Sequence, residues 1–333
     1  MSLKTKPKAL VTGGAGFIGS HLCEALLQAN YSVLCYDDLS HGSPANFGHL
    51  TSNSDFHFCH ADVCDRAALK KATNNAWIII HLAARKIPRY GDALSTLRVN
   101  NEGTRNVLEL AASQNVKVVL ASTSDVYGKG SPPFKESDDL IIGPSDVRRW
   151  SYAASKIFDE HLAQGFFSER NLPTVTLRFF GSYGPRNHRS WWGGPQAVFI
   201  EQALRGEPLT IHGDGSQTRS FTYIDDLIAG IMAASEKEAA VGQIINLGSE
   251  EEVTILELAN IISELIWPGK TPKTKFIPYE SFGGRYEDVK RRLPNLTKAR
   301  KILGFTWNIK LREGLIKTIA WHKKTPPPIN LAG

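Results

Sequence analysis

A glycine-rich stretch near the start of the chain constrains its fold more than any other feature. The stretch reads Val11-Thr12-Gly13-Gly14-Ala15-Gly16-Phe17-Ile18-Gly19, with an apolar run before it and a helix-like run, residues 21–27, after it. A strand that enters a tight glycine turn and continues into a helix is the setting in which such glycines bind a dinucleotide. Outside this setting the same pattern is an ordinary glycine-rich turn.

The glycines differ in what they are expected to do. Gly13 lets the chain turn sharply, Gly16 leaves the backbone open to a pyrophosphate, and Gly19 lets the helix pack against the strand. The first turn of the helix then presents free N–H groups and the positive end of its dipole to the phosphates. We therefore predict that Gly13, Gly16, Phe17, Ile18 and Gly19 contact a bound dinucleotide.

Apolar runs that alternate with helix-like segments predict the architecture. Strands are expected at 32–36, 56–60, 77–82, 116–121 and 174–179, with a long helix at 94–113. Strands separated by helices form a parallel sheet with helices on both faces. The predicted fold class is therefore α/β, a Rossmann-type doubly wound parallel sheet.

A change of composition marks a second, smaller lobe. Residues 181–194 are rich in Gly, Pro and Arg and contain Trp191-Trp192. We predict a dinucleotide-binding domain at 1–180, to which 221–248 return, and a C-terminal α/β lobe made of 181–220 and 249–322. The end of the chain, 323–333, contains three consecutive prolines and is predicted to be a loose tail.

An acidic residue follows the second predicted strand. An acid at the position of Asp37 hydrogen-bonds the adenine ribose and repels a 2′-phosphate, so NAD is predicted rather than NADP. The alternative is a turn-forming Asp37-Asp38 pair. The other predicted cofactor contacts lie after later strands or in the long helix: Asp62, Val63, Leu82, Ala83, Ala84 and Asn100.

Two further segments are expected to meet at the same edge of the sheet. Residues 122–128 are polar and follow a central strand, where doubly wound sheets bind their ligands. Tyr152 and Lys156 are four residues apart in an expected helix, so both face the same side. A lone Tyr-x-x-x-Lys is common by chance, but after a glycine fingerprint and a Ser/Thr strand end it indicates a catalytic pair.

Taken together, these motifs resemble the extended short-chain dehydrogenase/reductase family, in the branch that acts on nucleotide sugars. The resemblance rests on segments spread over nearly the whole chain: 11–21, 37–39, 81–84, 122–128, 152–156, 178–180, 183–186 and 213–221. It implies an NAD-dependent enzyme with a nucleotide-sugar substrate. The function that it favours is C4 epimerisation of a UDP-sugar through a 4-keto intermediate.

The same resemblance leaves two other reactions open. The first alternative is decarboxylation. It rests on two segments that resemble the pattern of UDP-glucuronate decarboxylases, Arg149-Trp150 and residues 291–294. Dehydratases carry an Asp-Glu pair after the catalytic threonine, where this chain has Ser124-Asp125, so dehydration is less favoured. Decarboxylases carry Ser-Glu there. Most of the branch has an asparagine that touches the sugar diphosphate where this chain has Gly181.

The resemblance and the chemistry of the side chains assign catalytic roles. Removal of a hydride from a sugar carbon needs a base for the hydroxyl proton, and nearby positive charges lower the pKa of a tyrosine. We predict Tyr152 as the base, Lys156 as the group that tunes it and holds the nicotinamide ribose, and Thr123 as the group that orients the reacting oxygen. This intact set argues against a non-catalytic NAD-binding sensor. Asp125 is either an acid facing the substrate or a carboxylate that holds its loop.

The substrate is expected to meet basic and aromatic residues. Arg219 and Arg292 are predicted to bind the diphosphate, because guanidinium groups pair well with phosphate oxygens. Ser124 and Arg186 are further candidates, and for each arginine the alternative is a solvated surface charge. The pair Trp191-Trp192 either stacks on a base or sugar or belongs to the core or to a subunit interface.

The composition bears on partners and location. No apolar run approaches the ~20 residues of a membrane helix, and the first strand begins too close to Met1 for a signal peptide. A cytoplasmic protein without membrane contact is predicted. The four cysteines lack zinc-ligand spacing, so no metal is predicted. The net charge of +6 comes from scattered residues, and nucleic-acid binding is not predicted. The resemblance implies a homodimer formed by the helices that begin near Leu94 and Tyr152.

Overall fold

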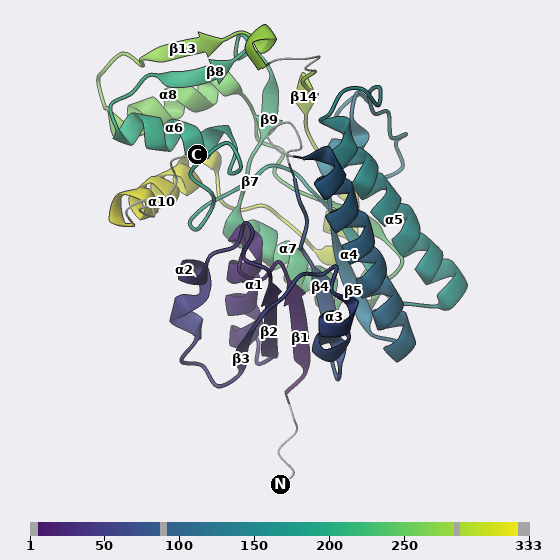
Figure 1. The fold of residues 1–333 in the computed structure, drawn as a ribbon. Helices are drawn as coiled ribbons and strands as arrows, with labels where there is room; N and C mark the ends of the chain where they lie inside the picture. The colour runs from purple at the N-terminus through teal and green to yellow at the C-terminus, as the bar shows by residue number, and fades with distance from the viewer. Residues whose placement is uncertain (1–5, 87–91, 283–286, 326–333) are drawn as a thin grey trace.

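The structure, a computed structural model, describes residues 6–86, 92–282 and 287–325. Its centre is a seven-stranded sheet in the order β11-β6-β5-β4-β1-β2-β3, in which every neighbouring pair is parallel (Figure 1). The strands are β1 (Lys8–Thr12), β2 (Ser32–Asp37), β3 (Phe56–His60), β4 (Ile78–His81), β5 (Lys117–Thr123), β6 (Thr174–Phe179) and β11 (Ile244–Leu247). The predicted Rossmann-type sheet is confirmed.

Helices cover both faces of the sheet because alternate side chains of a strand point to opposite sides. Leu10 of β1 packs into one core with α3 (Arg66–Thr73), α4 (Ala93–Gln114) and α5 (Trp150–Arg170). Its neighbours Ala9 and Val11 belong to a second core with α1 (Phe17–Gln28) and α7 (Ile224–Glu236). With both faces covered, the carboxyl edge of the sheet is left to receive ligands.

A second group of elements lies beyond this edge (Figure 1). It shares the second core, since Phe199 and Leu258 pack in the same cluster as Ala9 and Val11. Its elements are α6 (Pro195–Leu204), β8 (Leu209–His212), β9 (Thr218–Ser220), β12 (Glu252–Thr254), α8 (Ile255–Ile266), β13 (Thr274–Ile277), β14 (Arg291–Arg292) and α10 (Leu311–Lys324). The remaining α-helices and strands of the described residues are α2 (Pro44–Phe47), β7 (Ser182–Tyr183), β10 (Thr222–Tyr223) and α9 (Thr297–Leu303).

The end of the chain differs from the prediction of a loose tail beginning at 323. Helix α10 continues to Lys324, and the guanidinium of Arg189 donates a hydrogen bond to the carbonyl of Thr325. Buried His322 anchors the last turn through a hydrogen bond to Glu201. Basic residues in a last helical turn also interact favourably with the helix dipole. Residues 326–333 lie outside the described residues.

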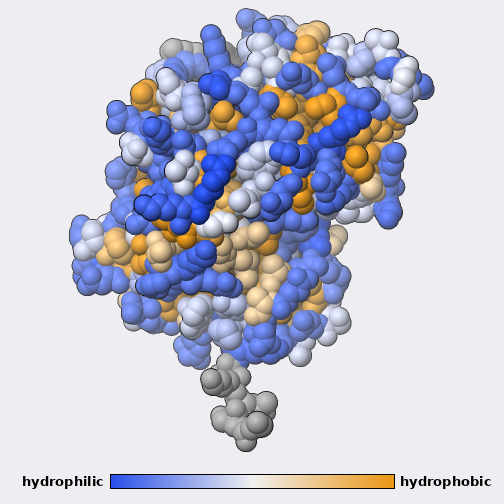
Figure 2. All heavy atoms as spheres, turned by 180° about the vertical axis from the view of Figure 1, so that it is seen from behind, coloured by the Kyte–Doolittle hydropathy of each residue, from blue (hydrophilic) through white to orange (hydrophobic). Residues whose placement is uncertain are grey.

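The distribution of polar and apolar residues on the surface is ordinary for a globular protein. The face seen from behind is mostly hydrophilic, with small hydrophobic areas interspersed (Figure 2). Within the described residues, no helix combines the length and the apolar character that crossing a membrane requires.

Candidate active site

The glycine loop between β1 and α1 folds as the sequence predicts. Gly13 has a φ of +71°, and its N–H donates to the carbonyl of Tyr36 at 2.8 Å. A Cβ at Gly19 would lie 2.1 Å from the carbonyl oxygen of Gly13, so only glycine allows α1 to approach the loop this closely. A Cβ at Gly16 would have one protein atom within 4 Å, at 3.2 Å, so the space beside Gly16 is open to a ligand.

This loop forms the wall of the first of two adjoining cavities. Every predicted cofactor contact except Asn100 lines the first cavity: Gly13, Gly16, Phe17, Ile18, Gly19, Asp37, Asp62, Val63, Leu82, Ala83, Ala84, Tyr152 and Lys156. Asn100 lies behind the wall, where it is fully buried. Its side chain bonds the backbone N–H and carbonyl of Arg85 and the hydroxyl of Ser155. It therefore ties the loop after β4 to α5 and, contrary to the prediction, does not line the cofactor cavity.

Asp37 presents its carboxylate at the end of β2. One oxygen accepts from the N–H of Ala15 at 3.0 Å and the other from the N–H of Leu39 at 2.8 Å. Burial raises the pKa of Asp37, and these two N–H groups oppose the increase. Each carboxylate oxygen keeps a second lone pair, which suits the hydroxyls of a ribose.

The predicted catalytic residues meet where the two cavities join. Tyr152 lines both cavities, Lys156 lines the first, and Thr123 and Ser124 line the second. Burial raises the pKa of Tyr152 far above its ordinary value, the charge of Asp125 adds to the increase, and a hydrogen bond with Thr123 opposes it. This direction differs from the lowering expected from Lys156. The Lys156 ammonium is itself bound to the buried carboxylate of Asp159 at 3.2 Å, which compensates its charge.

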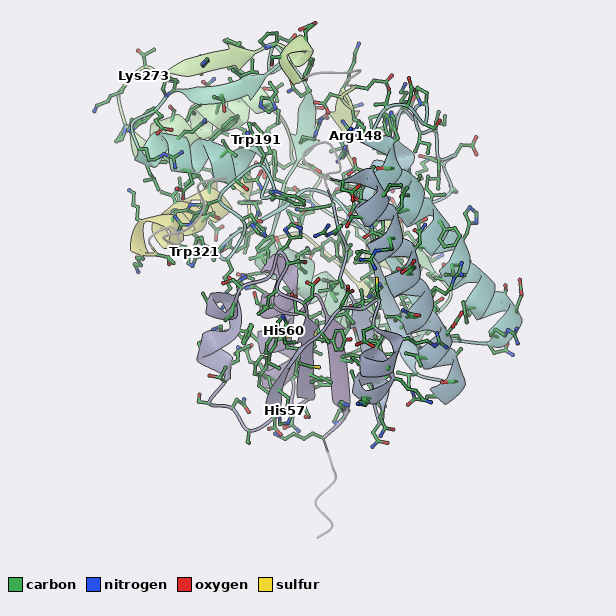
Figure 3. The ribbon with its side chains drawn as sticks, in the orientation of Figure 1. His57, His60, Arg148, Trp191, Lys273 and Trp321 are labelled. Carbon is green, nitrogen blue, oxygen red and sulfur yellow. The ribbon has the colours of Figure 1, made fainter. Side chains whose placement is uncertain are left out.

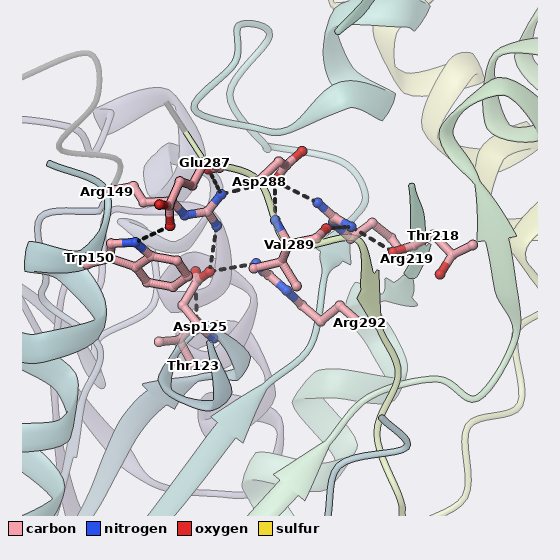
Figure 4. Close-up of polar contacts among 10 residues, drawn as sticks. All are labelled: Thr123, Asp125, Arg149, Trp150, Thr218, Arg219, Glu287, Asp288, Val289 and Arg292. Atoms are coloured by element: carbon pink, nitrogen blue, oxygen red, sulfur yellow. Dashed lines mark hydrogen bonds and ion pairs between the residues drawn. The ribbon is translucent and has the colours of Figure 1, made fainter. Parts of the chain in front are cut away.

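Asp125 is held by two arginines at the wall of the second cavity (Figure 4). Its Oδ1 accepts from Arg292 at 2.6 Å and from Arg149 at 3.3 Å, and the hydroxyl of Thr123 lies 3.4 Å from its Oδ2. Burial raises the pKa of Asp125, but the charges of Arg292, Arg149 and Arg219 outweigh it and hold this pKa at about 2. Asp125 is therefore ionised at neutral pH.

A second carboxylate, Asp288, completes this charged cluster. It accepts from Arg149 and from Arg219, each at 3.0 Å (Figure 4). Arg219 and Arg292 thus reach the second cavity as predicted, but each is already paired with an aspartate. Arg149 and Asp288 were not among the predicted site residues. The signals for Arg149 were its place directly before the helix of Tyr152 and the resemblance of Arg149-Trp150 to the decarboxylase pattern.

Three other residues that the sequence analysis singled out for substrate binding, Arg186, Gly181 and Trp191, lie in different places. Arg186 is outside the lining of both cavities, where its guanidinium binds Glu24 at 2.7 Å. Gly181 lines the second cavity, and a Cβ there would meet the carbonyl oxygen of Ser220 at 2.5 Å, which explains the absence of a side chain. Trp191 lines the second cavity and stacks on His212, with 3.9 Å between ring centroids (Figure 3).

Comparisons with known proteins identify the family. Residues 9–248 match the NAD dependent epimerase/dehydratase family, and the chain therefore belongs to that family of enzymes. It is 36% identical over 322 residues to UDP-N-acetyl-alpha-D-glucosaminuronate decarboxylase of Bacillus cytotoxicus, covering 96% of this chain and 98% of that relative. It is 33% identical over 330 residues to UDP-glucuronic acid decarboxylase 1 of Danio rerio, covering 97% of this chain and 74% of that relative.

A solved structure gives the same family relationship. UDP-glucuronic acid 4-epimerase from Bacillus cereus, in complex with UDP-glucuronic acid and NAD, aligns with a TM-score of 0.86 at 32% identity. The alignment covers 95% of this chain and 99% of that one. NAD is the cofactor of this family, and the first cavity fits it: Gly16 leaves space for a pyrophosphate, the first turn of α1 has no acidic residue, and Asp37 suits a ribose.

Two glycine substitutions test the NAD-binding role of the loop. We expect Gly19→Ala to weaken NAD binding at least tenfold and to lower the melting temperature, because the added methyl group would collide with the carbonyl of Gly13. Gly48→Ala, after α2, is the matched control. A Cβ there meets no atom within 4 Å and its backbone is right-handed helical, so it should leave NAD binding unchanged and stabilise the fold by about 0.5–1 kcal/mol. Calorimetric titration with NAD and thermal denaturation measure both effects, and unchanged NAD affinity in Gly19→Ala would contradict the role of the loop.

Proposed function

We propose that this protein is an NAD-dependent decarboxylase of a UDP-sugar acid that works through a 4-keto intermediate. The observation that carries the proposal is the ionised carboxylate of Asp125, which stands beside Thr123 at the wall of the second cavity. This choice reverses the order of preference that the sequence alone favours, in which C4 epimerisation comes first.

The first step of the proposed reaction uses the residues at the junction of the cavities. Tyr152 takes the proton of the sugar C4 hydroxyl, and Thr123 orients that oxygen. Bound NAD would supply the acceptor for the hydride of C4 and its later donor. Tyr152 gives its proton back to the C4 oxygen when the hydride returns. The positive charge of Lys156 favours the phenolate of Tyr152, although its pairing with Asp159 weakens this effect.

The second step follows from the charges around Asp125. A 4-keto sugar acid loses carbon dioxide when the electrons of the bond between C5 and the carboxyl carbon move toward the C4 carbonyl. The protonated Tyr152 can hydrogen-bond the oxygen that receives this charge, and C5 then takes a proton from solvent. Arg149 and Arg292 are paired with Asp125 and are therefore less able to neutralise a substrate carboxylate. The ionised Asp125 also repels that carboxylate, and loss of carbon dioxide relieves the repulsion.

The relatives of this chain support decarboxylation but do not decide between it and C4 epimerisation. The Bacillus cytotoxicus and Danio rerio relatives are decarboxylases of UDP-sugar acids that align over nearly the whole of this chain. The second candidate is a UDP-sugar 4-epimerase, because the Bacillus cereus enzyme with the same fold acts on C4 of UDP-glucuronic acid. An epimerase would use the same Thr123, Tyr152 and Lys156 but needs no carboxylate at the position of Asp125.

One incubation separates these reactions. The purified protein is mixed with NAD and either UDP-glucuronic acid or UDP-N-acetylglucosaminuronic acid in deuterium oxide, and the products are analysed by mass spectrometry and NMR. A decarboxylase releases carbon dioxide and incorporates one deuteron at C5. An epimerase inverts C4 with no change of composition and no deuteron from solvent. We expect the first result, and the second would assign the protein to the epimerases.

Three variants test the assigned roles within that assay. Tyr152→Phe should abolish turnover in either reaction and leave NAD binding nearly intact, because only a hydroxyl is lost. Asp125→Asn should slow decarboxylation by ~10²-fold or more, the typical effect of removing one electrostatic group from an active site. The control is Asp288→Asn, which removes the same charge from Arg149 at a position not bonded to Thr123. It should lower kcat much less than Asp125→Asn, because Asp125 keeps its charge and its contact with Thr123. Equal losses of kcat in both aspartate variants would contradict the role of Asp125.

We also propose that the protein is a cytoplasmic homodimer in which α4 and α5 pair with the same helices of a second copy. Leu94 and Phe158 on these helices are exposed hydrophobic residues, which supports such a contact. Sedimentation at micromolar concentration should give a dimer, and Phe158→Glu should give a monomer. A monomeric wild-type protein would contradict the proposed assembly.

A further inference from the structure

A segment of the second lobe forms part of the wall of the NAD cavity. Asn187, His188 and Trp192 line the first cavity together with His41, which belongs to the loop after β2. These residues were not predicted to meet the cofactor. The cavity is therefore built from two parts of the molecule, the edge of the sheet and the segment 187–192, which we call the strap.

The strap touches the loop after β2 through His41. The rings of Trp192 and His41 pack against each other, with 4.3 Å between their centroids and a tilt of 32° between their planes. The ring of His188 meets the ring of His41 edge-on, with 6.2 Å between their centroids. The Nε2 of His188 donates a hydrogen bond to the carbonyl oxygen of His41 at 2.9 Å. His41 is thus held by its ring and by its backbone, and both contacts lie at the cavity wall.

The strap is fixed to its own lobe through charged groups. Arg189 forms an ion pair with the buried carboxylate of Glu201 at 2.7 Å, and His322 of α10 bonds the same carboxylate at 2.6 Å. The guanidinium of Arg189 also lies 4.9 Å from the ring centre of Trp321, which Figure 3 shows on α10. These anchors hold the middle of the strap on α6 and α10, whereas its contact with the loop after β2 is made by the rings of Trp192 and His188 against His41 and by one hydrogen bond.

The two tryptophans of the segment differ in that only Trp192 reaches the first cavity. Trp192 lines both cavities and stacks on His41, whereas Trp191 lines only the second cavity and stacks on His212. The adjoining residues are chemically identical and close in sequence. They therefore form a natural pair for separating an effect on NAD from an effect on the sugar nucleotide.

We propose that the strap closes over bound NAD with the Trp192–His41 stack as its latch, so that NAD stays on the protein through successive turnovers. The inference rests on the proposed function in one respect: the hydride that leaves the sugar returns to it, so NAD need not exchange between turnovers. Opening the cavity toward solvent requires breaking the stack and the His188 hydrogen bond together. Breaking the stack should therefore speed the release of NAD more than it slows binding.

The test measures release of NAD in the absence of any sugar. The protein is loaded with radiolabelled NAD, freed of excess by rapid desalting, and chased with unlabelled NAD. We expect Trp192→Ala and His41→Ala each to release label about two- to tenfold faster than the wild type, the size of effect that an aromatic pair supports. The double variant should release NAD no faster than the faster single variant, because both substitutions remove the same contact.

Two further variants supply the controls. Trp191→Ala should release NAD at the wild-type rate, and Trp192→Phe, which keeps an aromatic ring, should restore most of the retention. Wild-type release by Trp192→Ala, or equally fast release by Trp191→Ala, would overturn the proposal. His41 and Trp192 lie in different lobes, so a folding defect in one variant leaves the other as the test, with melting temperatures measured for both. Because no sugar is present, the outcome does not depend on which reaction the enzyme performs.

Discussion

All seven strands of the central sheet run in the same direction, and this constraint determines where the site can be. The carboxyl ends of parallel strands share one edge, so residues that follow different strands meet there although they are far apart in the sequence. Four residues at such strand ends line the two adjoining cavities: Gly13 after β1, Asp37 at the end of β2, Leu82 after β4 and Thr123 at the end of β5. The second lobe adds its residues from the opposite side of the same space.

The charged cluster around Asp125 depends on this arrangement. Asp125 comes from the sheet edge, Arg149 from the approach to α5, and Arg219 and Arg292 from the small sheet of the second lobe. Withdrawing such charges from water costs several kcal/mol for each ion unless they are paired. The pairs with Asp125 and Asp288 offset that cost. The same ion pairs that shape the second cavity therefore also fix the second lobe against the first.

Much of the fold and part of the site could be predicted from local sequence. Apolar runs located the strands, and glycine spacing with Asp37 located the first cavity, because these signals lie within short segments. The four-residue spacing of Tyr152 and Lys156 placed both on one side of α5. The partners of the arginines could not be predicted in this way. Asp125 and Arg292 are distant in the chain, and no local pattern reports that two such residues meet.

Terminal and surface segments were harder to predict for a related reason. Helix α10 is strongly basic in its last turn, and what holds that turn is the contact of buried His322 with Glu201, which lies on another helix. Arg186 belongs to a motif of the family but binds Glu24 of α1. In both places a distant partner decides what the side chain does.

Gly181 has a consequence for how this protein can change over evolutionary time. Most nucleotide-sugar enzymes that the chain resembles have an asparagine at this position, but here the backbone carbonyl of Ser220 occupies the space that a Cβ would need. A single change of Gly181 to asparagine would therefore collide with the surrounding backbone. The segment that contains Ser220 would have to move first. While this glycine is kept, a change of sugar specificity has to come from other residues of the second cavity.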